Sequence, residues 1–295
     1  MYNTYGITPN TLNYKTYKDL SYDLKKNLYK IPSNIDLIVG IPRSGMIPAY
    51  MLALMLSKQA CSIREFISGD FKSVATYRVN LNKEVKNVLI IDDSINTGRA
   101  SLDTKKLIKD SGLEQQYNIF YAAVYYKDDN YKQFIDIALE KLPQPRVFQW
   151  NYLNHAFLKD AAFDIDGVLC VDPTNEENDD GENYKHFLLN AQPLFIPKHK
   201  IPYIITSRLE KYRQETEEWL HKNNVQYDHL IMLSGYTAEE RKKMNMHGKF
   251  KAEQYKKLSD IQLFIESNRK QAEEIANLSN KLCFCAATDE LFGRK

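Results

Sequence analysis

The sequence has no strong excess of charge, and it lacks the features that mark secreted or membrane proteins. Lysine and arginine number 40 and aspartate and glutamate 38 in 295 residues, so a net charge of +2 gives no global basic field that would favour a nucleic-acid partner. The longest apolar stretch, around residues 46–56, is far too short to span a bilayer. The first ten residues, MYNTYGITPN, are polar and show no signal-peptide pattern. We therefore expect a cytoplasmic protein without a transmembrane segment.

Cysteine is also scarce. The four cysteines have neither the spacing of a zinc site nor that of a redox motif, and we expect them to be reduced thiols. The content of 43% hydrophobic and 26% charged residues is ordinary for a globular protein, and 295 residues are enough for two domains with full cores.

Predicted strands and helices alternate along both halves of the chain. In the first half, strands are expected at residues 35–41, 88–91 and 117–125, and helices at 17–30, 46–57 and 98–110. In the second half, strands are expected at 161–165, 202–206, 229–233, 261–265 and 281–286, and helices at 183–190, 209–223, 250–258 and 269–279. Two prolines and several aromatic residues interrupt the alternation at 142–157. We therefore predict the α/β fold class, with doubly wound parallel sheets in two domains, residues 1–157 and 158–295.

The first polar motif is VLIIDDSINTGRAS at residues 88–101, in which an apolar strand leads to two aspartates and a Thr-Gly turn. The carboxyl end of a strand followed by a helix start is where an open α/β sheet binds ligands, and the helix start presents unpaired N–H groups to an anion. We expect this turn to bind a phosphate through Ser94, Asn96, Thr97 and Gly98. Because Asp92 and Asp93 would repel that phosphate, we expect them to accept hydrogen bonds from ribose hydroxyl groups.

The second motif is AAFDIDGVL at residues 161–169, another apolar strand that ends in carboxylates. Hydrolysis of a phosphate monoester is among the slowest uncatalysed reactions, and a carboxylate nucleophile divides it into two easier steps. Asp164 fits that nucleophile, and Asp166 is placed to protonate the leaving alkoxide and then to activate water. Carboxylates close to a phosphate need a cation to neutralise them, so we expect Mg²⁺ as the cofactor.

Residues 88–101 resemble the site that holds 5-phosphoribosyl-1-pyrophosphate (PRPP) in type I phosphoribosyltransferases. The resemblance implies that Asp92 and Asp93 hold the ribose hydroxyls, and that residues 94–98 hold the 5-phosphate. It also implies a pyrophosphate loop at residues 40–45, GIPRSG, in which the binding residues are Arg43, Ser44 and Gly45.

Two further features of the same resemblance concern the acceptor side of the site. A mobile loop that closes over PRPP in the family maps onto residues 62–86. Asn96 stands where some purine-using relatives have an aspartate that contacts the base. This difference argues against hypoxanthine or guanine as the acceptor and leaves other bases open.

Residues 161–169 resemble the first motif of haloacid-dehalogenase-like (HAD) phosphatases, and later segments resemble the other three motifs in order. The implied catalytic residues are Asp164, Asp166, Thr206 and Lys251, with Lys249 competing for the role of Lys251. The implied Mg²⁺ ligands are Asp164, Asp166 and Glu266. Because the gaps between the motifs are short, the resemblance implies a HAD-like Rossmannoid fold with a minimal cap and an open site.

Three segments, PRVFQWNY (145–152), GKFKAEQY (248–255) and FIESNRKQA (264–272), resemble fused phosphoribosyltransferase–phosphatase proteins of bacterial polysaccharide clusters. The resemblance implies a bifunctional enzyme that transfers 5-phosphoribosyl from PRPP to a glycan or lipid-linked glycan and releases pyrophosphate. The second domain would then hydrolyse the 5-phosphate through an aspartyl-phosphate and leave a ribofuranose. Nucleotide salvage retains its 5′-phosphate, so a fused phosphatase favours the glycan acceptor.

Two alternatives stay open. The first is a nucleobase phosphoribosyltransferase fused to a nucleotidase, in which Phe148, Trp150 and Tyr152 are available to stack on a base, although they stack on sugars as readily. The second is a PRPP-sensing regulator, whose nucleic-acid surface would have to be the only basic cluster, at residues 241–251. That cluster is more typical of a solvated helix face. The sequence does not decide whether the chain forms a homo-oligomer.

Overall fold

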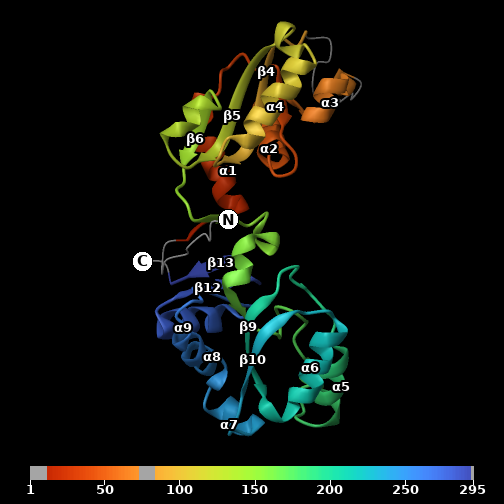
Figure 1. Ribbon diagram of the computed structural model, residues 1–295, viewed down its shortest axis with the longest axis vertical. Helices are drawn as coiled ribbons and strands as arrows, with labels where there is room; N and C mark the ends of the chain where they lie inside the picture. The colour runs from red at the N-terminus through yellow and green to blue at the C-terminus, as the bar shows by residue number, and fades with distance from the viewer. Residues whose placement is uncertain (1–11, 73–83, 294–295) are drawn as a thin grey trace. The chain divides into compact units, whose positions relative to one another are not determined.

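The computed structural model describes residues 12–72 and 84–293, and the chain divides into two compact units. The first unit is Lys15–Trp150, and the second is Asn151–Lys295 together with Met1–Tyr14. Each unit contains a mainly parallel sheet with helices on both faces, so the predicted α/β class is confirmed (Figure 1). The compact units change over at Asn151, and the domain boundary predicted after residue 157 stays a prediction.

The first unit has a five-stranded sheet in the order β3-β2-β4-β5-β6, in which every neighbouring pair is parallel. Its strands are β2 (Leu37–Gly40), β3 (Gln59–Ser62), β4 (Asn87–Ile95), β5 (Asn118–Tyr126) and β6 (Ile137–Lys141). Its helices are α1 (Tyr17–Lys26), α2 (Met46–Leu56), α3 (Ile63–Ser68) and α4 (Arg99–Asp110). Two short strands, β1 (Asn13–Lys15) and β7 (Arg146–Phe148), lie outside this sheet.

Alternate residues of the central strands bury against different helices. Ile38 and Leu89 belong to the cluster that contains the apolar residues of α1 and α2. Val39 and Ile90, their neighbours along the strands, belong to the cluster that contains the apolar residues of α3 and α4. Since successive strand residues point to opposite faces, the continuous apolar runs of β2 and β4 follow from a sheet that is covered on both sides.

The order of the strands creates a switch point in this sheet. The chain goes from β2 to β3 on one side and then returns to β4 on the other side of β2. Loops at the carboxyl ends of two such strands diverge and leave a crevice for a ligand. Here the diverging segments are residues 41–45 after β2 and the acidic end of β4.

The second unit has a six-stranded sheet in the order β10-β9-β8-β11-β12-β13, and all its pairs are parallel except the antiparallel β12 and β13. Its strands are β8 (Ala161–Phe163), β9 (Ile201–Leu209), β10 (Tyr227–Leu233), β11 (Leu263–Glu266), β12 (Leu282–Cys285) and β13 (Glu290–Phe292). Its helices are α5 (Glu182–Asn190), α6 (Arg213–Lys222), α7 (Ala238–Lys243), α8 (Met246–Lys257) and α9 (Arg269–Ser279).

The centre of the second sheet is β8, and its carboxyl end is again a switch point. Figure 1 shows α8 and α9 on one side of the sheet and α5 and α6 on the other. From β8 the chain builds β9 and β10 on one side and then crosses to β11 and β12 on the other. Asp164 follows β8 directly, so the second polar motif lies where this sheet is expected to bind a ligand.

The differences from the predicted elements have local causes. Helix α3 was missed, although its start carries the Ser-x-x-Glu signal of a capping box, with Ser62 and Glu65 bonded reciprocally. The helix predicted from residue 209 begins at Arg213, because β9 extends to Leu209. The strands β6 and β13 and the helix α7 were also missed. None of the four cysteines forms a disulfide, and among the described residues no helix is long and apolar enough to cross a membrane.

Candidate functional site

In the first unit, the loop after β2 contacts the acidic end of β4 directly. The Ser44 hydroxyl donates a hydrogen bond to Asp93 Oδ1 at 3.0 Å. A Cβ added to Gly45 would lie 2.6 Å from the Ile41 carbonyl oxygen and 2.9 Å from Asp92 Oδ1, so no side chain fits at this position. The fold thus brings four of the residues predicted to bind PRPP into one cluster.

The two carboxylates of this cluster have different surroundings. Asp93 is 4% exposed, and besides Ser44 it accepts a hydrogen bond from Trp150 Nε1 at 2.7 Å. Asp92 accepts a hydrogen bond from the backbone N–H of Asp93 at 2.8 Å. Burial, and then the charge of Asp93, raise the pKa of Asp92 to about 8. Near neutral pH, Asp92 is therefore largely protonated in the unliganded protein, and Asp93 is held by two donors.

The turn before α4 is shaped by a glycine and ends in an open helix terminus. Gly98 has a φ of 75°, and a Cβ there would lie 2.4 Å from the ring of Phe134. No side chain caps the helix that begins at Arg99, so the N–H groups of its first turn are available to an anion. The turn is shorter than predicted, because Ser94 still lies in β4 and pairs with Tyr125 of β5.

The aromatic residues predicted at 148–152 separate into two groups. The rings of Phe148 and Trp150 stack with their centroids 4.7 Å apart and an interplanar angle of 10°. Tyr152 instead packs against Phe284 in the second unit, at 4.7 Å. Of the three, Trp150 contacts the acidic pair directly, as a hydrogen-bond donor to Asp93, and Phe148 packs on its ring.

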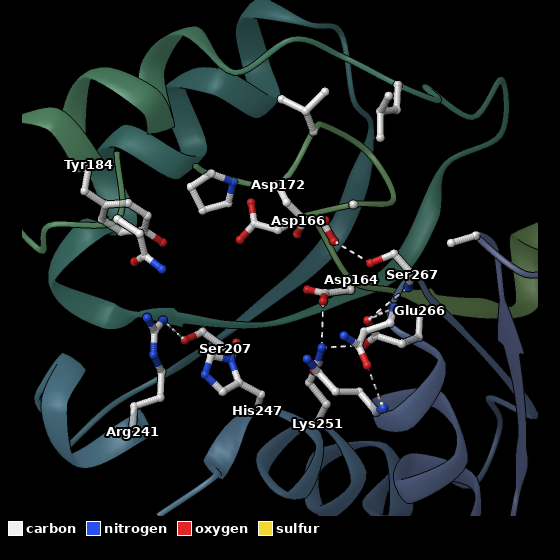
Figure 2. A pocket seen from close by; sticks show the side chains of 18 residues that line it. Asp164, Asp166, Asp172, Tyr184, Ser207, Arg241, His247, Lys251, Glu266 and Ser267 are labelled. Carbon is white, nitrogen blue, oxygen red and sulfur yellow. Dashed lines mark hydrogen bonds and ion pairs between the residues drawn. The ribbon is translucent and has the colours of Figure 1, made fainter. Parts of the chain in front are cut away.

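The second unit has a cavity of about 550 Å³ at the carboxyl end of β8 (Figure 2). Lys251 of α8 lies at its base, is 1% exposed, and donates to Asp164 Oδ2 at 2.7 Å and to the Glu266 carboxylate. Burial favours the neutral amine, but the charges and hydrogen bonds of the two carboxylates outweigh it and raise the pKa of Lys251. The competing Lys249 is exposed, so the structure brings Lys251 and not Lys249 into the cavity.

A fully buried arginine holds Asp166. Arg208, near the end of β9, donates from NH2 to Asp166 Oδ1 at 2.6 Å and from Nε to both carboxylate oxygens at 3.2 Å. A third aspartate of the cavity, Asp172, forms no ion pair with a described residue. Burial, followed by the charges of Asp166 and Asp164, raises its pKa. The carboxylates of this site therefore differ in charge environment, and Asp172 faces an excess of negative charge.

The three predicted metal ligands are not gathered into one cluster. One Glu266 oxygen bonds Lys251, and the other accepts from the backbone N–H groups of residues 267 and 268 at 3.0 Å. Among the described residues, no three metal-binding side chains converge, and the Asp164–Asp166–Glu266 set stays a prediction. Mg²⁺ often takes only one or two carboxylates and completes its shell with water. Asp164 and Asp166 both line the cavity and would be those carboxylates.

The hydroxyl that faces the cavity belongs to Ser207. Thr206 was predicted to contact the phosphoryl group, but it is 1% exposed and its Oγ1 accepts from the backbone N–H of Arg208 at 3.3 Å. Ser207 lines the cavity, and its Oγ lies 3.0 Å from Nδ1 of His247. Neighbouring strand residues point to opposite sides, so only one of the two hydroxyls can reach the cavity.

Comparison with known proteins identifies the first unit. Residues 7–141 match the family model described as the phosphoribosyl transferase domain. The N-terminal part of the chain carries a phosphoribosyltransferase domain. Its Asp92–Asp93 pair and its loop at residues 41–45 are the two predicted halves of the PRPP site.

Several proteins similar to this domain are named as phosphoribosyltransferases of purine bases, and another similar structure is named as an orotate phosphoribosyltransferase. Xanthine phosphoribosyltransferase 1 of Clostridium botulinum is 32% identical over 125 residues, which cover 35% of this chain and 64% of that protein. A Helicobacter pylori xanthine-guanine-hypoxanthine phosphoribosyltransferase structure has a TM-score of 0.36 at 17% identity and covers 48% of this chain and 94% of its own. A Pyrococcus horikoshii purine phosphoribosyltransferase structure has a TM-score of 0.33 at 21% identity, and the match covers 47% of this chain and 93% of that structure.

The remaining predicted residues lie at or beside these sites. Arg43, Asn96 and Thr97 are exposed on the loops of the phosphoribosyltransferase domain. The predicted mobile loop at 62–86 includes residues 73–83, which lie outside the described residues. Sequence reasoning named Trp150 only as a stacking ring and Arg241 only as part of a basic cluster, and it missed Asp172, Arg208 and His247. Of these three, only Arg208 had a signal in the sequence, because it directly follows the Thr-Ser pair at a strand end.

Proposed function

We propose that the phosphoribosyltransferase domain transfers the 5-phosphoribosyl group of PRPP to an acceptor, and that the second unit hydrolyses a phosphate monoester. One observation carries the first half of this proposal. The loop after β2 and the acidic end of β4 are joined by the hydrogen bond between Ser44 and Asp93. A pyrophosphate loop and a ribose-binding pair have to be neighbours, because PRPP carries pyrophosphate on C1 beside its 2- and 3-hydroxyl groups.

In the transfer step, a nucleophilic atom of the acceptor forms a bond to C1, the bond from C1 to the pyrophosphate oxygen breaks, and the acceptor loses a proton. The first turn of α4 would bind the 5-phosphate through its N–H groups. Asp93 would orient the ribose by accepting its hydroxyl protons, and Asp92 would join it once ionised. Holding C1 and the acceptor together lowers the entropic part of the barrier.

The acceptor that we propose first is a nucleobase, because a curated relative of this domain is named for xanthine. The comparisons support a base better than the glycan that the sequence alone favoured. Hydrolysis of the nucleotide product in the second unit would then yield a nucleoside. A glycan hydroxyl is the second candidate, since a chain with a hydrolase-type cavity could convert a 5-phosphoribosyl glycan into a ribofuranosyl glycan.

For the hydrolysis, Asp164 would attack phosphorus, so that an aspartyl-phosphate forms and the bond from phosphorus to the leaving alkoxide breaks. Asp166, oriented by Arg208, would take up a proton from solvent when the phosphate dianion enters and pass it to the alkoxide, and the carboxylate that results would take a proton from the water that hydrolyses the intermediate. Lys251 would orient Asp164 through their ion pair. Mg²⁺ held by Asp164 and Asp166 would neutralise charge on the phosphoryl group when bound.

Two single variants test the two activities separately. The full chain is incubated with Mg²⁺, isotope-labelled PRPP, a panel of purine and pyrimidine bases, and a lysate fraction that contains lipid-linked and polymeric glycans. We expect Asp93→Asn to transfer nothing while it still hydrolyses an added phosphate monoester. We expect Asp164→Asn to accumulate a 5-phosphorylated product. The matched controls are Asp110→Asn and Asp228→Asn, because both side chains are exposed, Asp110 at the carboxyl-terminal end of α4 and Asp228 in an ion pair with Lys200.

The molecule that carries the label, and whether it retains its 5-phosphate, distinguish the two acceptors and test the two assigned residues. Label in nucleotides supports the nucleobase acceptor, whereas label in a glycan moves the assignment to the second candidate. Transfer retained by Asp93→Asn would reject the ribose-binding assignment. Dephosphorylated product from Asp164→Asn would show that another group is the nucleophile.

A further inference from the structure

Arg241 was expected on a solvated helix face, but it is buried in the wall of the second cavity. The residue lies on α7 and is 5% exposed. Its NH1 donates to the carbonyl oxygen of Ser207 at 2.9 Å, and its Nε is buried and has no hydrogen-bond partner in the described part of the chain. Figure 2 shows the guanidinium beside Ser207, on the wall opposite Glu266.

The charges around the cavity single out this guanidinium. The other two buried cations are paired with carboxylates: Lys251 with Asp164 and Glu266, and Arg208 with Asp166. Arg241 forms no ion pair with any described residue. Taking a guanidinium out of water without a counter-charge is unfavourable, because the charge loses its hydration. An anion that enters the cavity would supply the missing partner.

The groups next to Arg241 are hydrogen-bonding ones. Ser207 and His247 line the same wall, and their side chains are 3.0 Å apart. Tyr184 of α5 lies close enough for the charge of Arg241 to oppose the rise in the pKa of Tyr184 that burial causes. A guanidinium, a hydroxyl and an imidazole are suited to the oxygens of a tetrahedral oxyanion.

We propose that Arg241 binds the phosphoryl oxygens of the phosphate monoester, beside Ser207 and His247. This inference rests on the hydrolase activity proposed for the second unit and names the residue that recognises the dianion. Lys251 is already neutralised by two carboxylates, so it cannot balance the dianion alone. Arg241 supplies that charge. A substitution at this position would therefore weaken substrate binding and the stabilisation of the negative charge that develops in the transition state.

The test compares Arg241→Ala and Arg241→Lys with the wild-type chain, with p-nitrophenyl phosphate as the substrate. We expect kcat/KM to fall by about tenfold to a hundredfold in Arg241→Ala, and by less in Arg241→Lys, because one charge-assisted hydrogen bond is lost. The inhibition constant of inorganic phosphate should rise in parallel. Added guanidinium ion, below denaturing concentrations, should restore part of the activity of Arg241→Ala.

Arg213→Ala is the matched control, because Arg213 is a half-buried arginine of the same unit that is paired with Glu210 and Glu217. Guanidinium should not increase its activity. If the inhibition constant of inorganic phosphate is unchanged in Arg241→Ala, or if guanidinium does not restore activity to this variant, the role of Arg241 in binding the phosphoryl group is overturned, even when the wild type is active. If the wild type hydrolyses no monoester, the proposed hydrolase activity fails; calorimetric binding of inorganic phosphate that depends on Arg241 would still support the anion site. If Arg241→Ala does not fold, Arg241→Lys is tested in the same assays.

Discussion

Replacing Lys251 by methionine should remove the cation that two buried carboxylates share. Lys251 and Glu266 are each 1% exposed, and Asp164 is 5% exposed. Removing one partner of a buried ion pair typically costs about 3–5 kcal/mol, because the remaining charge is left without compensation. We expect a loss of this size in the free energy of unfolding of the second unit at pH 8, together with loss of monoester hydrolysis.

The stability that Lys251→Met loses should depend on pH, and the loss should be smaller at lower pH. Burial already raises the pKa of Glu266 above its ordinary value, and removal of Lys251 removes the main opposing influence. The folded variant therefore binds more protons than the unfolded chain at pH values between the two pKa values of Glu266, so its stability rises as the pH falls through that window. Adding Glu266→Gln to Lys251→Met should recover part of the lost stability, since one of the uncompensated charges is then removed.

Tryptophan fluorescence can follow the second unit alone. The chain has two tryptophans, and in a Trp150→Phe background the remaining Trp219, which is 1% exposed, reports unfolding of the second unit. Urea unfolding at pH 8 and at pH 5 then gives the two free energies. If Lys251→Met costs the same at both pH values and the double variant recovers nothing, the ion pair does not stabilise this unit as reasoned here.

Three further predictions concern groups that orient or tune the carboxylates. Trp150→Phe keeps the aromatic packing but removes a donor to Asp93, and we expect kcat/KM for PRPP in the transfer assay to fall by about tenfold. In the wild type, kcat/KM for PRPP should rise as the pH increases through about 8, because ionised Asp92 can accept a hydrogen bond from a ribose hydroxyl. This rise should be absent in Asp92→Asn. Arg208→Met leaves Asp166 without its buried partner, so unfolding should become easier by about 3 kcal/mol in urea titrations and hydrolysis should fall more than in Arg208→Lys.

The fold class was predictable because the apolar pattern carries it. Strands buried on both faces, such as β2 and β4, are continuous apolar runs, and the helices between them have one apolar face. Elements without that signal were missed. The edge strand β13 is only partly buried, and α7 is short and strongly charged, so neither has a periodic apolar pattern.

Local motifs also predicted that the two candidate sites lie at the carboxyl ends of β4 and β8, because a carboxylate that follows an apolar run can be recognised from adjacent residues alone. Partners that are distant in the sequence could not be found in this way. Trp150 reaches Asp93 across 57 positions, and Arg208 reaches Asp166 across 42. Neither contact leaves a trace in the spacing of nearby residues.

By itself, the sequence determined two α/β units, each with an acidic strand end at which a phosphate-containing ligand is expected, because periodicity and motif spacing are local properties of a chain. The tertiary structure alone decided how each acidic group is charged and held. Burial beside Asp93 raises the pKa of Asp92, Lys251 binds Asp164 and Glu266, and Arg241 lies in the cavity without a carboxylate partner in the described part of the chain. These properties depend on desolvation and on charges brought close by folding, and both act over distances that are set by packing in three dimensions.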